Sequence, residues 1–157
     1  MRRLAFLLLA IQSSVIFAID PVTPPDSPIV VYQSDGDYDD IKANLEMAIA
    51  DRGMLITNTL HISDMLERTA EDTGLDKKLY QKAESLEFCS ILMSYRMSLA
   101  HPANLAICPL TIGIYKGLEG TDPVHVVFRR PRLLGDAAQA TQSVTELLDG
   151  IVQEALE

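Results

Sequence analysis

The chain contains two cysteines, three histidines and six methionines, the side chains with redox and soft-metal chemistry. Cys89 and Cys108 lie in separate strand-like segments, and a disulfide between them would close a loop of about 20 residues. In an exported protein this disulfide is the interpretation we favour, because oxidising compartments allow such bonds to form. Two buried thiols and a thiolate metal site stay open as alternatives. A redox-active pair would more often show Cys-x-x-Cys spacing, which is absent.

His61 stands just before a short helix that we expect Ser63 to cap. A helix N-terminus disfavours a cationic imidazole, so the neutral ring could bind a metal or accept a proton. We expect His61 to be partly accessible at the edge of a cleft, with Met65 nearby, and His61→Ala to weaken ligand binding while stability changes by under about 0.5 kcal/mol. The alternative is a structural histidine that is hydrogen-bonded within the domain.

Met93, Met97 and His101 recur at intervals of four, so a helix through them would align all three. Thioether and imidazole ligands suit copper or haem iron, which makes His61, Met97 and His101 candidate metal ligands. The alternative is core filling, the usual role of a methionine stripe at helical spacing. No motif of the sequence requires a cofactor, since it has no haem-attachment, zinc, phosphate-loop or nucleophile-elbow pattern.

Arg129, Arg130 and Arg132 form a basic cluster in an acidic chain. We expect these arginines to pair with the acidic surface, because most exposed charge clusters are solvated or weakly paired. The alternative is an anion site, in which Arg129 and Arg130 would contact a bound ligand.

Residues 1–18 have the pattern of a secretory signal peptide. Arg2 and Arg3 precede the apolar run Leu4–Ile11, and small residues lead to Ala18, after which we expect cleavage. An uncleaved anchor is the alternative, although a membrane span needs about 20 apolar residues. Cleavage predicts a periplasmic or secreted bacterial protein that is not held at a membrane. It lowers the net charge from −9 to −11, because two basic residues and no acidic ones are removed. This charge disfavours nucleic acid and anionic membranes as partners, because the field of the protein repels phosphates.

The rest of the chain predicts one domain of class α+β. Residues 19–28 contain four prolines and are expected to be a linker, and residues 29–157 are expected to form the domain. The expected elements are a strand at 29–33, a helix at 37–53, a strand at 54–62, a helix at 63–73, a helical connector at 76–84, three strands within 86–131 and a last helix.

The last helix carries the clearest apolar stripe, which includes Leu147, Leu148 and Ile151. We expect Asp136 and Gln139 to form its capping box, as Asp37 should cap the first helix. Such a stripe must be buried, so a curved antiparallel sheet of about five strands with helices on one face is the predicted architecture.

Several short motifs point to a known family. They are Asp-Tyr-Asp-Asp at 37–40, Asp-Arg-Gly at 51–53, His61 before a short helix, Pro109 in a strand, and Val-Val-Phe-Arg-Arg-Pro ending at Pro131. In these features the chain resembles domain-of-unknown-function family 302. The resemblance implies a small α+β fold that is distantly TATA-binding-protein-like, and it implies no activity. Met-Ser-Tyr-Arg at 93–96 replaces the Phe-Gly-Asn-Pro of many members, as in a secreted branch with two cysteines.

Two functions follow as expectations. The first is a non-catalytic exported module that holds a small ligand, or part of a periplasmic partner protein, between the sheet and its helices, through His61, Met65, Arg129 and Arg130. The second is a metal or haem protein of periplasmic redox traffic that uses His61 with methionine or cysteine ligands. The identity of the ligand and the formation of a homodimer stay open.

Overall fold

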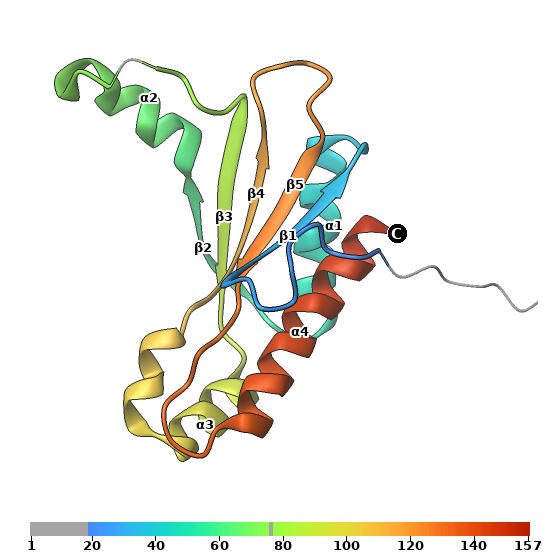
Figure 1. The fold of residues 1–157 in the computed structure, drawn as a ribbon, viewed down its shortest axis with the longest axis vertical. Coiled ribbons are helices and arrows are strands. Elements are labelled where there is room, and N and C mark those ends of the chain that lie inside the picture. Colours follow the sequence, from blue (N-terminus) through green and yellow to red (C-terminus); the bar gives the residue numbers. More distant parts are fainter. Residues whose placement is uncertain (1–18, 76) are drawn as a thin grey trace, which may run out of the picture.

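The computed structural model describes residues 19–75 and 77–157, so the expected signal peptide lies outside the described residues. The elements in chain order are β1 (Ile29–Ser34), α1 (Tyr38–Asp51), β2 (Ile56–His61), α2 (Ile62–Thr73), β3 (Lys82–Phe88), α3 (Ile91–Ala100), the 3-10 helix η1 (Pro102–Ile107), β4 (Leu110–Lys116), β5 (Val124–Arg129) and α4 (Ala138–Leu156). Figure 1 shows α1 and α4 packed side by side against the sheet.

The five strands form one antiparallel sheet in the order β1-β5-β4-β3-β2. Alternate residues of the central strands face α1 and α4, because successive side chains of a strand point to opposite faces. Leu86, Ile112, Val126 and Val30 lie on this buried face in neighbouring strands. The prediction of a single α+β domain with a five-stranded antiparallel sheet is therefore confirmed.

Helix α4 supplies the other half of the core. Its residues Val144, Leu148 and Ile151 are fully buried, as the apolar stripe predicted, whereas Leu147 at the margin of the stripe is only partly buried. The predicted capping box is wrong, because α4 begins at Ala138 and no side chain caps it.

Helix α1 begins and ends as expected. The carboxylate of Asp37 accepts hydrogen bonds from the N–H groups of Asp39 (2.8 Å) and Asp40 (3.2 Å), which would otherwise have no partner in the first turn. The helix is followed by Gly53, whose φ of 71° is readily adopted only by residues without a side chain.

The region around α2 differs from expectation. Ser63 does not cap this helix, which begins at Ile62; its Oγ accepts a hydrogen bond from the N–H of Ala83 (3.2 Å). Residues 77–81 are not helical, and β3 already begins at Lys82. Figure 1 shows α2 projecting away from the sheet, so only its first turns can contact the rest of the domain.

The edge strand β2 is also less buried than its alternation predicted. A bulge between Ile56 and Asn58 shifts its pairing with β3. As a result Leu60 is exposed, and His61 pairs with Glu84 on the face of the sheet that carries the helices. The strand thus ends in a polar cluster.

The insertion between β3 and β4 forms α3 and η1. The sulfurs of Cys89 and Cys108 are bonded, with their Cα atoms 6.3 Å apart, which joins the end of β3 to the start of β4. The predicted disulfide is thereby confirmed in the structure. The peptide bond between Cys108 and Pro109 is cis.

Residues 19–28 lie along the domain. The N–H of Val22 donates to the carbonyl of Val31 in β1 (2.8 Å), and the N–H of Ile19 donates to Oε1 of Gln153 in α4 (2.8 Å). Residues 19–28 therefore cover the edge of the sheet that is formed by β1. Among the described residues, no helix is both long and apolar enough to cross a bilayer.

Candidate functional site

A cavity of about 320 Å³ opens where β1, β4 and β5 meet α4 and η1. Its apolar wall consists of Ile29, Ile107, Leu110, Val144 and Leu148, with three prolines. Its polar lining consists of Thr111 and the guanidinium-bearing residues Arg129, Arg130 and Arg132. The volume lies at the lower end of the range of about 300–1,000 Å³ for small-molecule sites, and the mixture of apolar wall and few polar groups is typical of them.

The three arginines of this cavity have no ion-pair partner among the described residues. No carboxylate lines the cavity. None of the three forms any of the ion pairs found in the described part of the chain, although the chain has 22 acidic residues. The expected pairing with the acidic surface is thus not seen as a close ion pair in the described residues, and the alternative, an anion site, fits the geometry.

Backbone contacts fix where these arginines lie. Strand β5 ends at Arg129, and the N–H of Arg130 donates to the carbonyl of Pro28 (2.9 Å) while its Nε donates to the carbonyl of Ser27 (3.2 Å). Pro131 then prevents β5 from continuing, because proline has no N–H for the sheet ladder. Arg130 thus keeps its two terminal nitrogens for another acceptor, and Arg129 and Arg132 remain exposed.

His61 belongs to a different cluster, near the end of the sheet where β2 meets α2 (Figure 1). Its Nδ1 lies 2.6 Å from Oε1 of Glu84, and Nζ of Lys42 lies 2.8 Å from Oε2 of the same carboxylate. The hydroxyl of Tyr38 in α1 lies 3.2 Å from that oxygen and donates to it. The His61 side chain is 58 % exposed, so it is accessible as expected.

Electrostatics favour the ionised form of Glu84. Burial raises the pKa of this carboxyl, but Lys42, Tyr38 and His61 outweigh burial and hold the pKa below its ordinary value. Burial raises the pKa of the Tyr38 hydroxyl, and the nearby charge of Glu84 raises it further. The cluster is therefore a hydrogen-bonded carboxylate with Lys42 on one side and His61 on the other, and His61 keeps only Nε2 for another partner.

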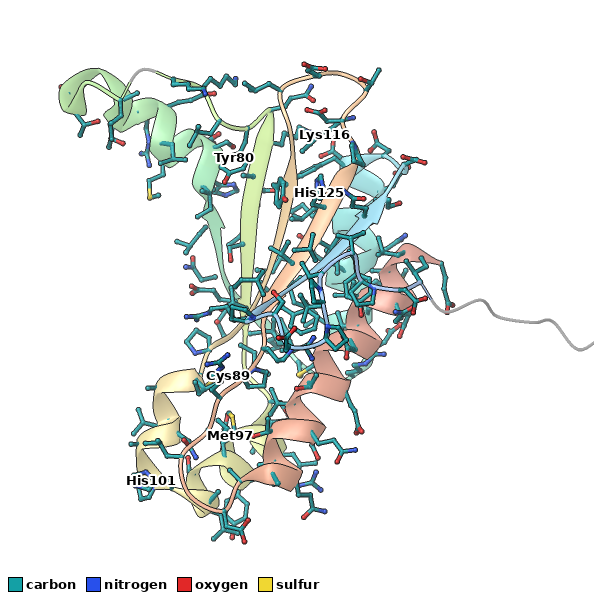
Figure 2. The ribbon with its side chains drawn as sticks, viewed as in Figure 1. Tyr80, Cys89, Met97, His101, Lys116 and His125 are labelled. Carbon is teal, nitrogen blue, oxygen red and sulfur yellow. A yellow bond between two sulfur atoms is a disulfide. The ribbon has the colours of Figure 1, made fainter. Side chains whose placement is uncertain are left out.

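The structure does not bring the expected metal ligands together. Met97 is fully buried in the core, and the Nδ1 of His101 accepts a hydrogen bond from Ala103 N–H at the start of η1 (3.1 Å). Figure 2 shows both residues beyond the far end of the sheet from the β2–α2 junction, where His61 lies. Met65 is exposed on α2. Within residues 19–75 and 77–157, no three His, Cys, Asp or Glu side chains are grouped to hold a metal ion.

Sequence reasoning missed a stack of rings on the other face of the sheet. His125 of β5 stacks on Tyr115 of β4 with ring centroids 4.5 Å apart, and Tyr80 lies 5.5 Å from Tyr115 (Figure 2). Nε2 of His125 is 2.8 Å from Nε2 of Gln33 across the β1–β5 pair. Tyr115 and His125 are paired across the consecutive strands β4 and β5, so the exact register of these strands would have been needed to place their rings together.

A second hollow of about 620 Å³ lies between α2 and residues 74–80. Two lysines line it, Lys77 and Lys78, and Lys78 is paired with Glu67 (2.6 Å). The lining segment is interrupted at residue 76, which lies outside the described residues, so the arginine-lined cavity is the better-defined candidate.

The comparisons with known proteins agree with the fold. The family model "Domain of unknown function DUF302" matches residues 30–156. A solved structure, described as an uncharacterized conserved DUF302 protein from Bacillus stearothermophilus, is 14 % identical, with a TM-score of 0.65, and the match covers 83 % of this chain and 98 % of that one. No curated protein matches the chain.

Proposed function

Because the chain belongs to the DUF302 family, whose description names no function, we propose from its own geometry that it is a non-catalytic module that binds small organic anions. The observation that carries the proposal is the set of arginines Arg129, Arg130 and Arg132 around a partly apolar cavity without any carboxylate in its lining. The ligand would place its acidic group among these arginines and an apolar part against Val144 and Leu148.

The energetics favour such a ligand over a purely polar one. Guanidinium groups form charge-assisted hydrogen bonds with carboxylates or phosphates, and these bonds are about twice as strong as neutral ones. The apolar wall would add about 25 cal/mol for each Å² of ligand surface removed from water. An amphiphilic acid would gain both the charge-assisted hydrogen bonds and the apolar burial, whereas a sugar or a metal ion would gain neither in full.

The proposal includes export. The pattern of residues 1–18 supports cleavage near Ala18, and a structural disulfide is a common feature of secreted and periplasmic proteins. Intact-mass measurement of the protein recovered from a bacterial periplasm tests this part. A mass that still includes residues 1–18 would refute cleavage without affecting the binding proposal.

Calorimetric titration with decanoate tests the binding proposal, with decanol as the uncharged probe of equal chain length. We expect decanoate to bind and decanol to bind at least about tenfold more weakly, since a hydrogen bond to a charged group contributes about 1.5–3 kcal/mol. Arg132→Gln should weaken decanoate binding by a similar factor. Arg68→Gln, which removes an exposed arginine from α2, should leave the binding unchanged.

Two results would refute the proposal. One is a titration without any heat of decanoate binding to the wild-type protein at millimolar concentration. The other is an equal loss of affinity in Arg132→Gln and Arg68→Gln, because a general effect of charge, and not the cavity, would then account for the binding.

A further inference from the structure

Acidic residues are scarce at one end of the molecule, where Asp136 stands between the loop after β5 and α4. No Asp or Glu occurs in residues 88–118 or in residues 123–135, although the whole chain has 22. The basic residues of these two segments are Arg96, Lys116, Arg129, Arg130 and Arg132. Lys116 lies at the opposite end of the sheet, whereas α3, η1 and the loop after β5 gather at the end marked by Met97 and His101 (Figure 2). We call this region the α3 end.

The α3 end also exposes large apolar side chains. Helix α3 buries Met97 on its inner side, yet Ile91 is 90 % exposed and Leu99 is 73 % exposed on its outer side. Tyr95, Leu92, Leu105 and Leu134 are also exposed at this end. At 3.6 residues per turn, Ile91, Tyr95 and Leu99 form one stripe, and Arg96 lies at its margin. A helix that is apolar on its buried side and on its outer side has a surface without a partner.

We propose that the α3 end docks on the surface of an anionic lipid bilayer. The stripe of Ile91, Tyr95 and Leu99 would enter the boundary between headgroups and acyl chains, and Arg96 with Arg132 would contact lipid phosphates. Apolar burial combined with attraction to anionic lipid is how interfacial helices bind, and aromatic rings such as that of Tyr95 favour the headgroup level.

The net negative charge of the chain disfavours an anionic bilayer, but the local charge of the α3 end is positive. At physiological ionic strength the Debye length is about 8 Å, so exposed charges further away than that are largely screened. The C-terminal end of α4, with Glu154 and Glu157, lies away from the α3 end (Figure 1). At the α3 end itself, Arg96, Arg129, Arg130 and Arg132 outnumber Asp136, so a bilayer in contact with it meets a locally positive surface.

Charge also favours a bilayer over a second copy of this chain. A two-fold symmetric contact pairs the same patch on both subunits. Two copies joined through the α3 stripe would bring the arginines of both patches to one contact, where they outnumber Asp136, the acidic residue at this end. Anionic lipid supplies the opposite charge at every position of the patch.

Flotation with vesicles tests the docking. The two vesicle types are phosphatidylcholine alone and an equal mixture of phosphatidylcholine with phosphatidylglycerol. All variants must share one N-terminus, as determined by intact mass, because residues 4–11 are themselves apolar. We expect binding to the anionic vesicles only, a loss of about tenfold for Leu99→Ser, and a loss of about fivefold for Arg96→Gln, the factor expected for one arginine near a charged surface.

The matched control is Leu75→Ser, because Leu75 is 74 % exposed, as Leu99 is, but lies beyond α2 at the other end of the molecule. It should bind as the wild type does. The chain has no tryptophan, so Tyr95→Trp adds a single reporter, whose emission should shift to the blue on anionic vesicles if the stripe enters the bilayer.

The docking is refuted if the wild type does not float with anionic vesicles, which is also the result expected if the α3 end binds an acidic protein. Equal losses in Leu99→Ser and Leu75→Ser would refute it as well. The two proposals share Arg132, but the variants Leu99→Ser and Arg96→Gln leave the lining of the organic-anion cavity unchanged. Leu99→Ser should therefore bind decanoate as the wild type does, even though it loses vesicle binding. This result separates the test of docking from the test of organic-anion binding.

Discussion

Asn104 and Leu134 are joined by two hydrogen bonds between η1 and the loop after β5. The N–H of Leu134 donates to Oδ1 of Asn104 (2.8 Å), and Nδ2 of Asn104 donates to the carbonyl of Leu134 (3.1 Å). The same Nδ2 also donates to the carbonyl of Met97 in α3 (2.9 Å). One buried amide therefore holds α3, η1 and the arginine-bearing loop together.

Asn104→Ala should lower the free energy of unfolding by about 2–4 kcal/mol, because it leaves buried backbone groups at Met97 and Leu134 without partners. Urea denaturation measures this loss. Asn58→Ala, which removes an exposed amide bonded to Glu87, should cost under about 0.5 kcal/mol. Equal losses in the two variants would show that Asn104 is not the anchor of this end.

Leu148→Ala should lower the free energy of unfolding by about 2–4 kcal/mol, because the side chain is enclosed between α4 and the sheet. Leu147→Ala is the matched control on the same helix, and its smaller burial predicts a smaller loss. Thermal melts of both variants check the order. A melting temperature that Leu148→Ala leaves unchanged would mean that α4 is peripheral to the core.

The elements that the sequence predicted well are those with strong local signals. The apolar stripe of α4 requires burial wherever the helix packs, and Asp37 together with Gly53 marks both ends of α1. The cap predicted for Ser63 failed because a tertiary hydrogen bond from Ala83 competes for the same hydroxyl. No local pattern encodes such a partner, which lies 20 residues away.

The candidate site was predictable only in part. The cluster of Arg129, Arg130 and Arg132 is visible in the sequence, but its lack of acidic partners depends on where the carboxylates lie in space. The prediction that Met97 and His101 are aligned on one helix as metal ligands failed for a similar reason. Helix α3 ends at Ala100, and the His101 ring accepts a hydrogen bond from Ala103. The pairing of His61 with Glu84 depends on strand order, which sequence alone does not give.

Replacing both cysteines, Cys89→Ala with Cys108→Ala, should cost about 3 kcal/mol, the entropy of a closed loop of this length. A reducing agent should lower the melting temperature of the wild type and leave that of the double variant unchanged. In reducing buffer, Cys89→Ala alone should have the same melting temperature as the double variant. A wild-type melting temperature that is insensitive to reductant would show that the bond is absent from the protein as purified.

His61→Ala should change the free energy of unfolding by under about 1 kcal/mol, because the ring is largely exposed and exposed ion pairs contribute little. It should also leave decanoate affinity unchanged, since His61 lies far from the arginine-lined cavity. Calorimetric titration and a thermal melt of this one variant give both values. A loss of decanoate binding without a loss of stability would move the binding site to the cluster around His61.

The pH dependence of stability should report the buried carboxyl of Glu84. Its pKa is lowered in the folded protein, although burial raises it, because Lys42, Tyr38 and His61 together favour the ionised form. A carboxyl whose folded pKa is below its unfolded value of about 4.5 stabilises the fold above that pH and loses this contribution as the pH falls through the folded pKa. Glu84→Gln should therefore lose less stability than the wild type between about pH 5 and the acid limit.

Lys42→Met should reduce the same acid dependence. Without the ammonium group 2.8 Å from Oε2, burial is less opposed and the folded pKa of Glu84 rises toward its unfolded value, so less stability is lost as the pH falls. At neutral pH this variant should be less stable than the wild type, because the ionised carboxylate has lost a favourable partner. Urea denaturation at a series of pH values measures all three proteins. If Glu84→Gln keeps the wild-type slope through the acid range, other carboxyls account for that slope. If Lys42→Met also keeps the wild-type slope, Lys42 does not stabilise the charge on Glu84.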